Sequence, residues 1–174
     1  MVWLWLDDQP NTVVDIYNEL KENKIAIEKF QNPAELSNFL IDKKDSLDKF
    51  GLILDVMLQG QKLISIPKAW SGKDTDEYKI SNGMGHDAGL LFYEEFVLGI
   101  SNKNEPFWKN PPPVLFLTVI DNKTTSFDNR LNNVKHYWKK HHNINEENRI
   151  NVAWERKWER KSNFIDILKR YNNA

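Results

Sequence analysis

Three of the apolar runs in this chain are followed directly by a residue with a chemically informative polar side chain. Val2–Leu6 stops at Asp7, the run 50–54 stops at Asp55, and the run 114–117 stops at Thr118. Continuous apolar segments of this length are typical of strands buried on both faces of a parallel sheet. The pattern therefore predicts buried strands whose carboxyl ends carry Asp7, Asp55 and Thr118.

Between and after these runs, apolar residues recur at helical spacing or alternate as in a short strand. The expected helices begin near Pro10 and after Asn32–Pro33, cover 87–97 and 131–138 and follow Ser162, and the expected short strands lie at 25–27 and 150–154. Strands that alternate with helices favour βαβ crossovers, since a parallel connection needs a helix to return the chain. We therefore predict an α/β fold, with a parallel sheet and helices on both of its faces.

The length of 174 residues suits one domain that spans 1–174. Two regions are longer than the connections that alternating strands and helices require. The stretch of about 60–85 lacks a clear period and contains Gly, Pro and Ser, which indicates a long loop or a small subdomain inserted after the third strand. The second region, about 121–148, extends the connection between the fourth and fifth strands.

Composition and charge narrow the classes of function. Seven tryptophans and 40% hydrophobic residues indicate a folded core, and the absence of cysteine excludes disulfides, thiolate catalysis and sulfur-ligated zinc. The apolar start at 2–6 is too short for a signal peptide or a membrane span, so we expect a soluble cytoplasmic protein without a membrane partner. A net charge of -1 argues against a nucleic-acid partner. The basic, aromatic stretch 135–140 could contact nucleic acid, but a solvated amphipathic helix is the simpler interpretation.

The chemistry of the chain concentrates at the predicted strand ends. Asp7, Asp8 and Asp55 would meet at one edge of a parallel sheet, where ligand sites of such folds lie. Three like charges repel, and a divalent cation with hard oxygen ligands, Mg²⁺, would resolve that repulsion. Asp55 could then accept a phosphoryl group, Thr118 could hydrogen-bond one of its oxygens, and a lysine at the next strand end could pair with another.

These motifs, in this order, resemble those of the response-regulator receiver domain. The matching segments are Leu6-Asp7-Asp8, 52–57 with Asp55, 87–91 with Asp87 and Gly89, and 113–118 with Thr118. The resemblance implies a flavodoxin-like, doubly wound, five-stranded parallel sheet in the order 2-1-3-4-5. It also implies that Asp7, Asp8, Asp55 and the backbone carbonyl of Met57 hold Mg²⁺.

The receiver family places a lysine after the fifth strand, with an aromatic residue three positions earlier. Lys157 with Trp154 fits this spacing, and so does Lys161 with Trp158. We favour Lys157, because the alternating strand pattern at 150–154 directly precedes it. The chain departs from the family where proline is usual, at Gln59 and Trp158, where a third acid often stands, at Gln9, and in its two long insertions.

The resemblance implies a stand-alone receiver that accepts phosphate on Asp55 from a histidine kinase or a phosphotransfer protein. Its output would be contact with a downstream protein target, and it would not be an enzyme beyond self-catalysed phosphotransfer. The alternative is a pseudo-receiver, a protein-binding scaffold that works without phosphorylation. A phosphatase of the haloacid dehalogenase type would want a second acid two residues after the first, where this chain has Met57.

Overall fold

The structure is a computed structural model that describes residues 1–9, 13–43, 46–47, 49–58, 63–67, 75–79, 88–99, 111–118, 125–142, 152–156 and 163–172. Within these residues, five strands form one parallel sheet in the order β2-β1-β3-β6-β7. Their bounds are β1 Val2–Leu6, β2 Ala26–Phe30, β3 Phe50–Asp55, β6 Val114–Thr118 and β7 Val152–Arg156. The predicted α/β fold with a parallel sheet is confirmed.

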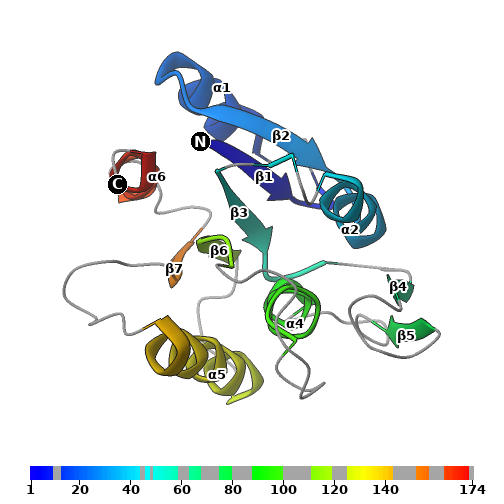
Figure 1. Ribbon diagram of the computed structural model, residues 1–174. Coiled ribbons are helices and arrows are strands. Elements are labelled where there is room, and N and C mark those ends of the chain that lie inside the picture. The colour runs from blue at the N-terminus through cyan, green and yellow to red at the C-terminus, as the bar shows by residue number, and fades with distance from the viewer. Residues whose placement is uncertain are drawn as a thin grey trace.

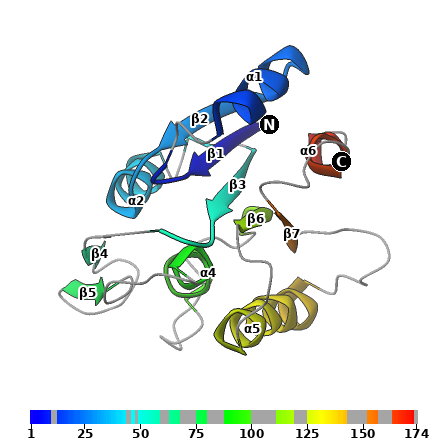
Figure 2. The ribbon, with the colours of Figure 1, turned by 180° about the vertical axis from the view of Figure 1, so that it is seen from behind.

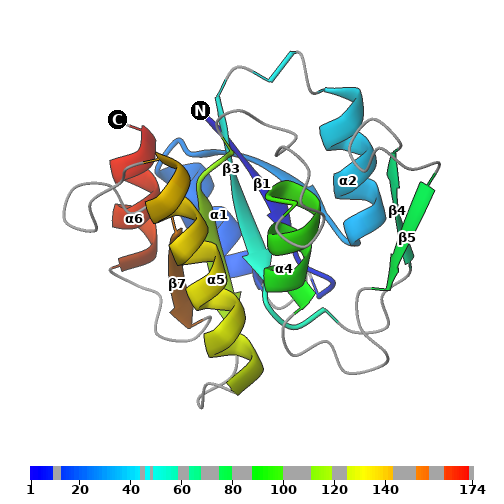
Figure 3. The same ribbon diagram turned by 60° about the horizontal axis from the view of Figure 1, so that its bottom comes forward.

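Helices cover both faces of the sheet (Figure 1). One face packs against α1 (Val14–Glu22) and α6 (Asn163–Asn172), and the other packs against α2 (Pro33–Asp42), α4 (Ala88–Leu91) and α5 (Thr125–His142). Figure 3 shows α4 and α5 side by side over the sheet. No helix in the described ranges has the length and apolar character needed to cross a membrane.

The strand alternation of β1 explains how the two layers form. Trp3 and Trp5 point into the layer of α1 and α6, while Leu4 and Leu6 point into the opposite layer, and all four side chains are buried. Both faces of β1 are therefore apolar, which is the pattern that a central parallel strand requires. Trp3 Nε1 also donates to Asn172 Oδ1 at 3.4 Å, which ties the end of α6 to the sheet.

Helix α2 begins as its sequence predicts. The side chain of Asn32 accepts a hydrogen bond from the backbone N–H of Glu35 at 2.9 Å, and Pro33 occupies the first turn. Helix α1 begins at Val14, and the expected start at Pro10 lies outside the described residues. The cap on α2 fixes the direction in which the chain leaves the carboxyl end of β2.

The expected helix over 87–97 is divided into α4 and a π-helix, η2 (Phe92–Val97). A π-helix has a wider turn than an α-helix, and three consecutive residues of η2 are buried: Phe92, Tyr93 and Glu94. Tyr93 Oη donates to the carbonyl oxygen of Pro112 at 2.6 Å and accepts from Trp138 Nε1 at 3.2 Å. The buried tyrosine therefore links η2 to α5 and to the residues that lead into β6.

Two strands lie within the region expected to be a long loop or a small subdomain. β4 (Leu63–Pro67) and β5 (Thr75–Lys79) pair antiparallel and form a separate two-stranded sheet. This hairpin lies beside α2 and apart from the main sheet (Figures 2 and 3). The other residues of 60–85 lie outside the described ranges.

Tyr171 of α6 gives a testable prediction about stability at high pH. Its ring packs edge-on against the ring of Trp3, with 5.4 Å between the ring centroids. Its buried Oη has no hydrogen-bond partner in the described residues. Burial raises the pKa of Tyr171 above its usual value, so the folded chain keeps a proton that the unfolded chain loses above about pH 10. Stability is therefore retained below that pH and falls above it, by about 1.4 kcal/mol per pH unit for one tyrosine.

We expect Tyr171→Phe to leave stability at neutral pH unchanged or slightly higher, because it removes an unsatisfied buried hydroxyl. Above pH 10 the variant should lose stability less steeply than the parent. Urea unfolding at several pH values measures both effects. Tyr17→Phe is the control, since it removes the same hydroxyl from a half-buried ring of α1, and equal slopes in the parent and Tyr171→Phe would contradict the prediction.

Candidate functional site

Three carboxylates meet at the carboxyl end of the sheet. Asp7, Asp8 and Asp55 each offer one oxygen atom, and these three atoms lie within 4.8 Å of one another. The register explains the meeting: β1 and β3 are adjacent parallel strands in which Leu6 pairs with Leu54, so the next residue of each strand is an aspartate at the same level. The sequence-based prediction that these acids converge is confirmed.

Hydrogen bonds from the backbone orient two of the carboxylates. Asp7 Oδ1 accepts the N–H of Gln9 at 2.9 Å, and Asp55 Oδ1 accepts the N–H of Met57 at 3.1 Å. Each is a local turn in which an aspartate bonds to the residue two positions later. The chain direction after each strand is thereby coupled to the position of the carboxylate.

The cluster is largely shielded from solvent. Asp7 is 3% exposed and Asp55 is 2% exposed, while Asp8 is half-buried. Three acids held this close in a shielded place repel one another, and a bound divalent cation would offset that cost. The donor set consists of hard oxygen atoms only, so the residues present fit Mg²⁺.

Gly89 of α4 lies against the backbone of Asp55. A Cβ atom at Gly89 would lie 2.9 Å from the carbonyl carbon of Asp55 and closer still to its oxygen. The N–H of Gly89 donates to the carbonyl of Val56 at 3.3 Å, and the N–H of Val56 donates to Leu117 at 2.7 Å. The glycine therefore allows α4 to abut the end of β3, while Asp87, the other named residue of the matching segment 87–91, lies outside the described residues.

The other predicted site residues are described only in part. Leu117 of β6 pairs with Asp55 of β3, so the backbone of Thr118 ends β6 at the level just beyond Asp55. The side chain of Thr118 and both candidate lysines, Lys157 and Lys161, lie outside what the structure describes. β7 ends at Arg156, one residue before Lys157.

Sequence reasoning missed a buried acid of η2. Glu94 of η2 is 4% exposed and accepts hydrogen bonds from Arg130 Nη1 at 2.5 Å and from Asn133 Nδ2 at 2.9 Å. Arg130 and Asn133 belong to α5, so the ion pair joins η2 to α5. The signal in the sequence was Glu94 itself, an acid that follows apolar residues within a predicted helix. An acid buried at such a position needs a partner for its charge.

Comparison with solved structures finds chains of similar fold. The N-terminal domain of a response regulator/sensory box/GGDEF three-domain protein from Carboxydothermus hydrogenoformans has a TM-score of 0.51 and 13% identity, over 99% of this chain and 94% of that one. A fusion that carries amino acids 181–211 of the yeast Spc42 trimeric coiled coil has a TM-score of 0.53 and 15% identity, over 99% and 78%. The receiver domain of Francisella response regulator 1452 has a TM-score of 0.42 and 16% identity, over 99% and 93%.

The sequence matches no protein-family model and no curated protein. At 13% and 15% identity, the structural likeness establishes the fold alone. The chain therefore has a receiver-like fold, similar to that of the N-terminal domain of the response-regulator protein from Carboxydothermus hydrogenoformans.

Proposed function

We propose that this chain is a response-regulator receiver that accepts a phosphoryl group on Asp55 with the help of Mg²⁺. The observation that carries the proposal is the convergence of Asp7, Asp8 and Asp55 within 4.8 Å at the carboxyl end of the sheet. The receiver-like fold supports it, because this edge is where parallel α/β sheets bind their ligands.

In the proposed reaction, a carboxylate oxygen of Asp55 attacks the phosphorus atom of a phosphodonor. An oxygen–phosphorus bond forms, and the bond from phosphorus to the donor atom breaks, so the donor atom leaves with the electron pair. The hydrogen bond from the N–H of Met57 to Asp55 Oδ1 restrains the attacking carboxylate. Thr118 and Lys157, with Lys161 as the alternative lysine, would bind oxygens of the transferred group.

Asp7, Asp8, Asp55 and the backbone carbonyl of Met57 would hold Mg²⁺. When bound, the ion supplies positive charge that neutralises the transferring phosphoryl group. Asp8 is half-buried, whereas Asp7 and Asp55 are buried, so the cluster lies closest to solvent at Asp8.

We further propose the partners that such a site needs. A histidine kinase or a phosphotransfer protein would donate the phosphoryl group, and a downstream protein would read the changed surface of the domain. The chain would catalyse its own phosphorylation and no turnover reaction. Charge added at Asp55 would act on neighbours such as Gly89 and α4, which abut it.

A second candidate function is a pseudo-receiver that binds proteins without phosphorylation. The burial of Asp55, which is 2% exposed, favours it, because an acid enclosed by its neighbours is poorly placed to meet a donor. In that case the β4–β5 hairpin would be part of the contact surface, since it stands apart from the main sheet (Figure 1).

Titration with Mg²⁺ separates the two candidates. For a receiver we expect saturable binding by calorimetry and a loss of affinity of at least about tenfold, or about 1.4 kcal/mol, in Asp8→Ala, because one ligand oxygen is removed. Asp15→Ala is the matched control, since it removes an exposed carboxylate of α1 outside the cluster. Mg²⁺ binding that is weak and indifferent to Asp8→Ala would contradict the receiver proposal and favour the scaffold.

A further inference from the structure

The outward side of α5 carries basic residues that neither the fold nor the acidic cluster uses. Lys135, His136, Lys139 and Lys140 are all exposed, and α5 itself lies on the outside of the fold, over the sheet (Figure 3). Lys135 with Lys139, and His136 with Lys140, are four residues apart, so each pair lies along one side of the helix with about 5–6 Å between its Cβ atoms. We call these four residues the basic face of α5.

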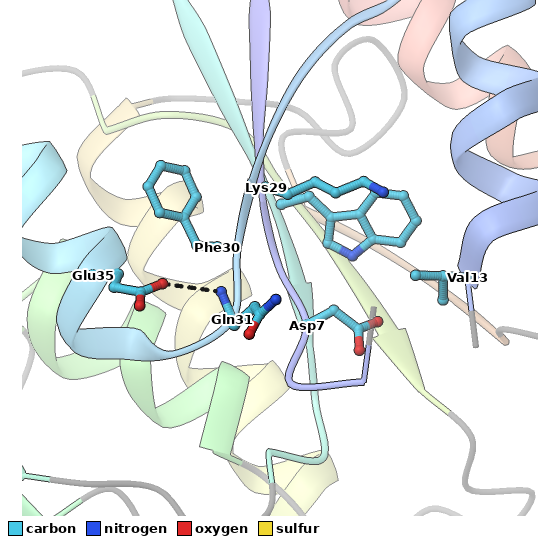
Figure 4. Close-up of a pocket in the computed structure, with 7 residues that line it drawn as sticks. Asp7, Val13, Lys29, Phe30, Gln31 and Glu35 are labelled. Carbon is cyan, nitrogen blue, oxygen red and sulfur yellow. Dashed lines mark hydrogen bonds between the residues drawn. The ribbon is translucent and has the colours of Figure 1, made fainter. Parts of the chain in front are cut away.

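The positive charge of the basic face is not balanced by its neighbours. Within the described residues, none of its four side chains forms a hydrogen bond or an ion pair. Arg130, the arginine of α5, differs, because it pairs with the buried Glu94. Lys29 differs as well, since it shares a cavity of about 350 Å³ with Asp7 and Glu35 (Figure 4). The basic face therefore remains open to an anionic partner.

The charge of α5 has the opposite sign to that of the rest of the chain. α5 contains four Lys or Arg residues and one acid, Asp128, whereas the whole chain contains 24 Lys or Arg and 25 Asp or Glu residues. The rest of the chain is therefore net negative. An anionic partner that spread over much of the surface would be repelled there, and one confined to α5 would not.

The aromatic residues of the stretch 135–140 are turned away from this face. Trp138 is 7% exposed and donates to Tyr93 Oη, and the half-buried Tyr137 packs against the same core. Proteins bind single-stranded nucleic acid by stacking bases on exposed aromatic rings, and they bind duplexes through many phosphate contacts. A short row of cations without stacking rings, on a chain that is otherwise acidic, disfavours both kinds of nucleic acid.

Two other occupants are also disfavoured. The apolar side of α5, with Leu131, Val134 and Trp138, is buried in the core, so it is not available to insert into a membrane. A symmetric contact between the basic faces of two copies of the chain would bring like charges together. An acidic segment of another protein avoids each of these difficulties.

We propose that the basic face of α5 is a docking surface for an acidic protein segment, namely a helix with Asp or Glu residues four positions apart. Acids at that spacing have the same separation as Lys135 and Lys139, so the two rows can meet pair by pair. Exposed ion pairs are individually weak and are screened by salt, so binding needs several of them. The surface does not require Asp55 or its phosphorylation, and it goes beyond the proposed function.

A synthetic alanine-based helical peptide with glutamates four residues apart tests the proposal. It is titrated into the ¹⁵N-labelled full chain at about 0.15 M salt, where distant charges are screened. We expect saturable shifts of the backbone amides of 135–140, in the parent and equally in Asp55→Asn. The same peptide with glutamine in place of each glutamate should cause no shift.

The double variant Lys135→Gln/Lys139→Gln should bind the glutamate peptide about fivefold more weakly or worse, because two of the cations are removed. The matched control is Lys21→Gln/Lys169→Gln, which has the same net charge, loses exposed lysines of α1 and α6, and should bind as the parent does. The proposal is overturned if the glutamate peptide causes no saturable shift. It is also overturned if the two double variants bind alike, since overall charge alone would then explain the binding.

A single-stranded oligonucleotide and vesicles that contain phosphatidylserine test the alternative occupants under the same conditions. At a matched concentration of negative charge, both should bind more weakly than the glutamate peptide. If either binds as tightly or more tightly, the basic face does not select an acidic protein and the proposal is wrong. All these titrations are made without Mg²⁺ or a phosphodonor, so a failure of Asp55 to accept phosphate leaves them unaffected.

Discussion

Replacing Asp55 with alanine is expected to abolish the gain of one phosphoryl group when the protein is incubated with Mg²⁺ and a small phosphodonor such as acetyl phosphate. The parent should gain a single group, because the proposed nucleophile is one carboxylate at the centre of the acidic cluster. Alanine has no oxygen to attack phosphorus, so the effect should be complete. Intact-mass measurement of both proteins reads the result directly.

Two further variants make the result specific. Asp15→Ala removes an exposed acid of α1 and should be phosphorylated as the parent is. Asp8→Ala keeps the nucleophile and should be phosphorylated much more slowly, since it removes a proposed metal ligand. A parent that gains no phosphoryl group, or an Asp55→Ala protein that still gains one, would rule out the proposed role of Asp55.

The acidic cluster could be predicted from the sequence because its geometry depends on short-range pattern. An apolar run that ends on an acid places that acid at the end of a buried strand, and parallel strands align their carboxyl ends. Because Leu6 pairs with Leu54 in adjacent parallel strands, the next residues, Asp7 and Asp55, come together. Both strands have strong apolar runs, so their ends could be located to the residue.

The extent of β2 could not be predicted in the same way. The expected strand covered 25–27, whereas β2 spans Ala26–Phe30 and includes Lys29. β2 is the edge of the sheet and three of its five residues are exposed, so it lacks the apolar run that marks a central strand. The pairing of Lys29 with Trp5 is therefore a result of the tertiary structure alone.

The division of the expected helix over 87–97 into α4 and a π-helix could not be predicted from the sequence either. Apolar spacing predicted a helix, and the chain does coil there, but a π-helix allows both Tyr93 and Glu94 to be buried. Each of these polar side chains is stabilised by residues distant in sequence: Trp138 for Tyr93, and Arg130 for Glu94. A local pattern contains no information about such partners.

Replacing Gly89 with alanine is expected to destabilise the protein by about 3 kcal/mol, despite the higher helix propensity of alanine. The added Cβ would overlap the carbonyl oxygen of Asp55, which belongs to a central strand and cannot move without disturbing the hydrogen bond from Val56 to Leu117. Helix α4 must then withdraw from the end of β3. Urea unfolding measures the loss of free energy, and the same displacement should lower Mg²⁺ affinity.

Gly99→Ala is the matched control, because it adds the same methyl group where no atom lies within 4 Å. Gly99 has a φ of 64°, so alanine there should cost about 1 kcal/mol of backbone strain and leave Mg²⁺ affinity unchanged. The difference between the two variants isolates the contact of α4 with Asp55 from the general effect of losing a glycine. If the two cost the same, α4 does not press on the end of β3, and a charge on Asp55 would have no direct route to that helix.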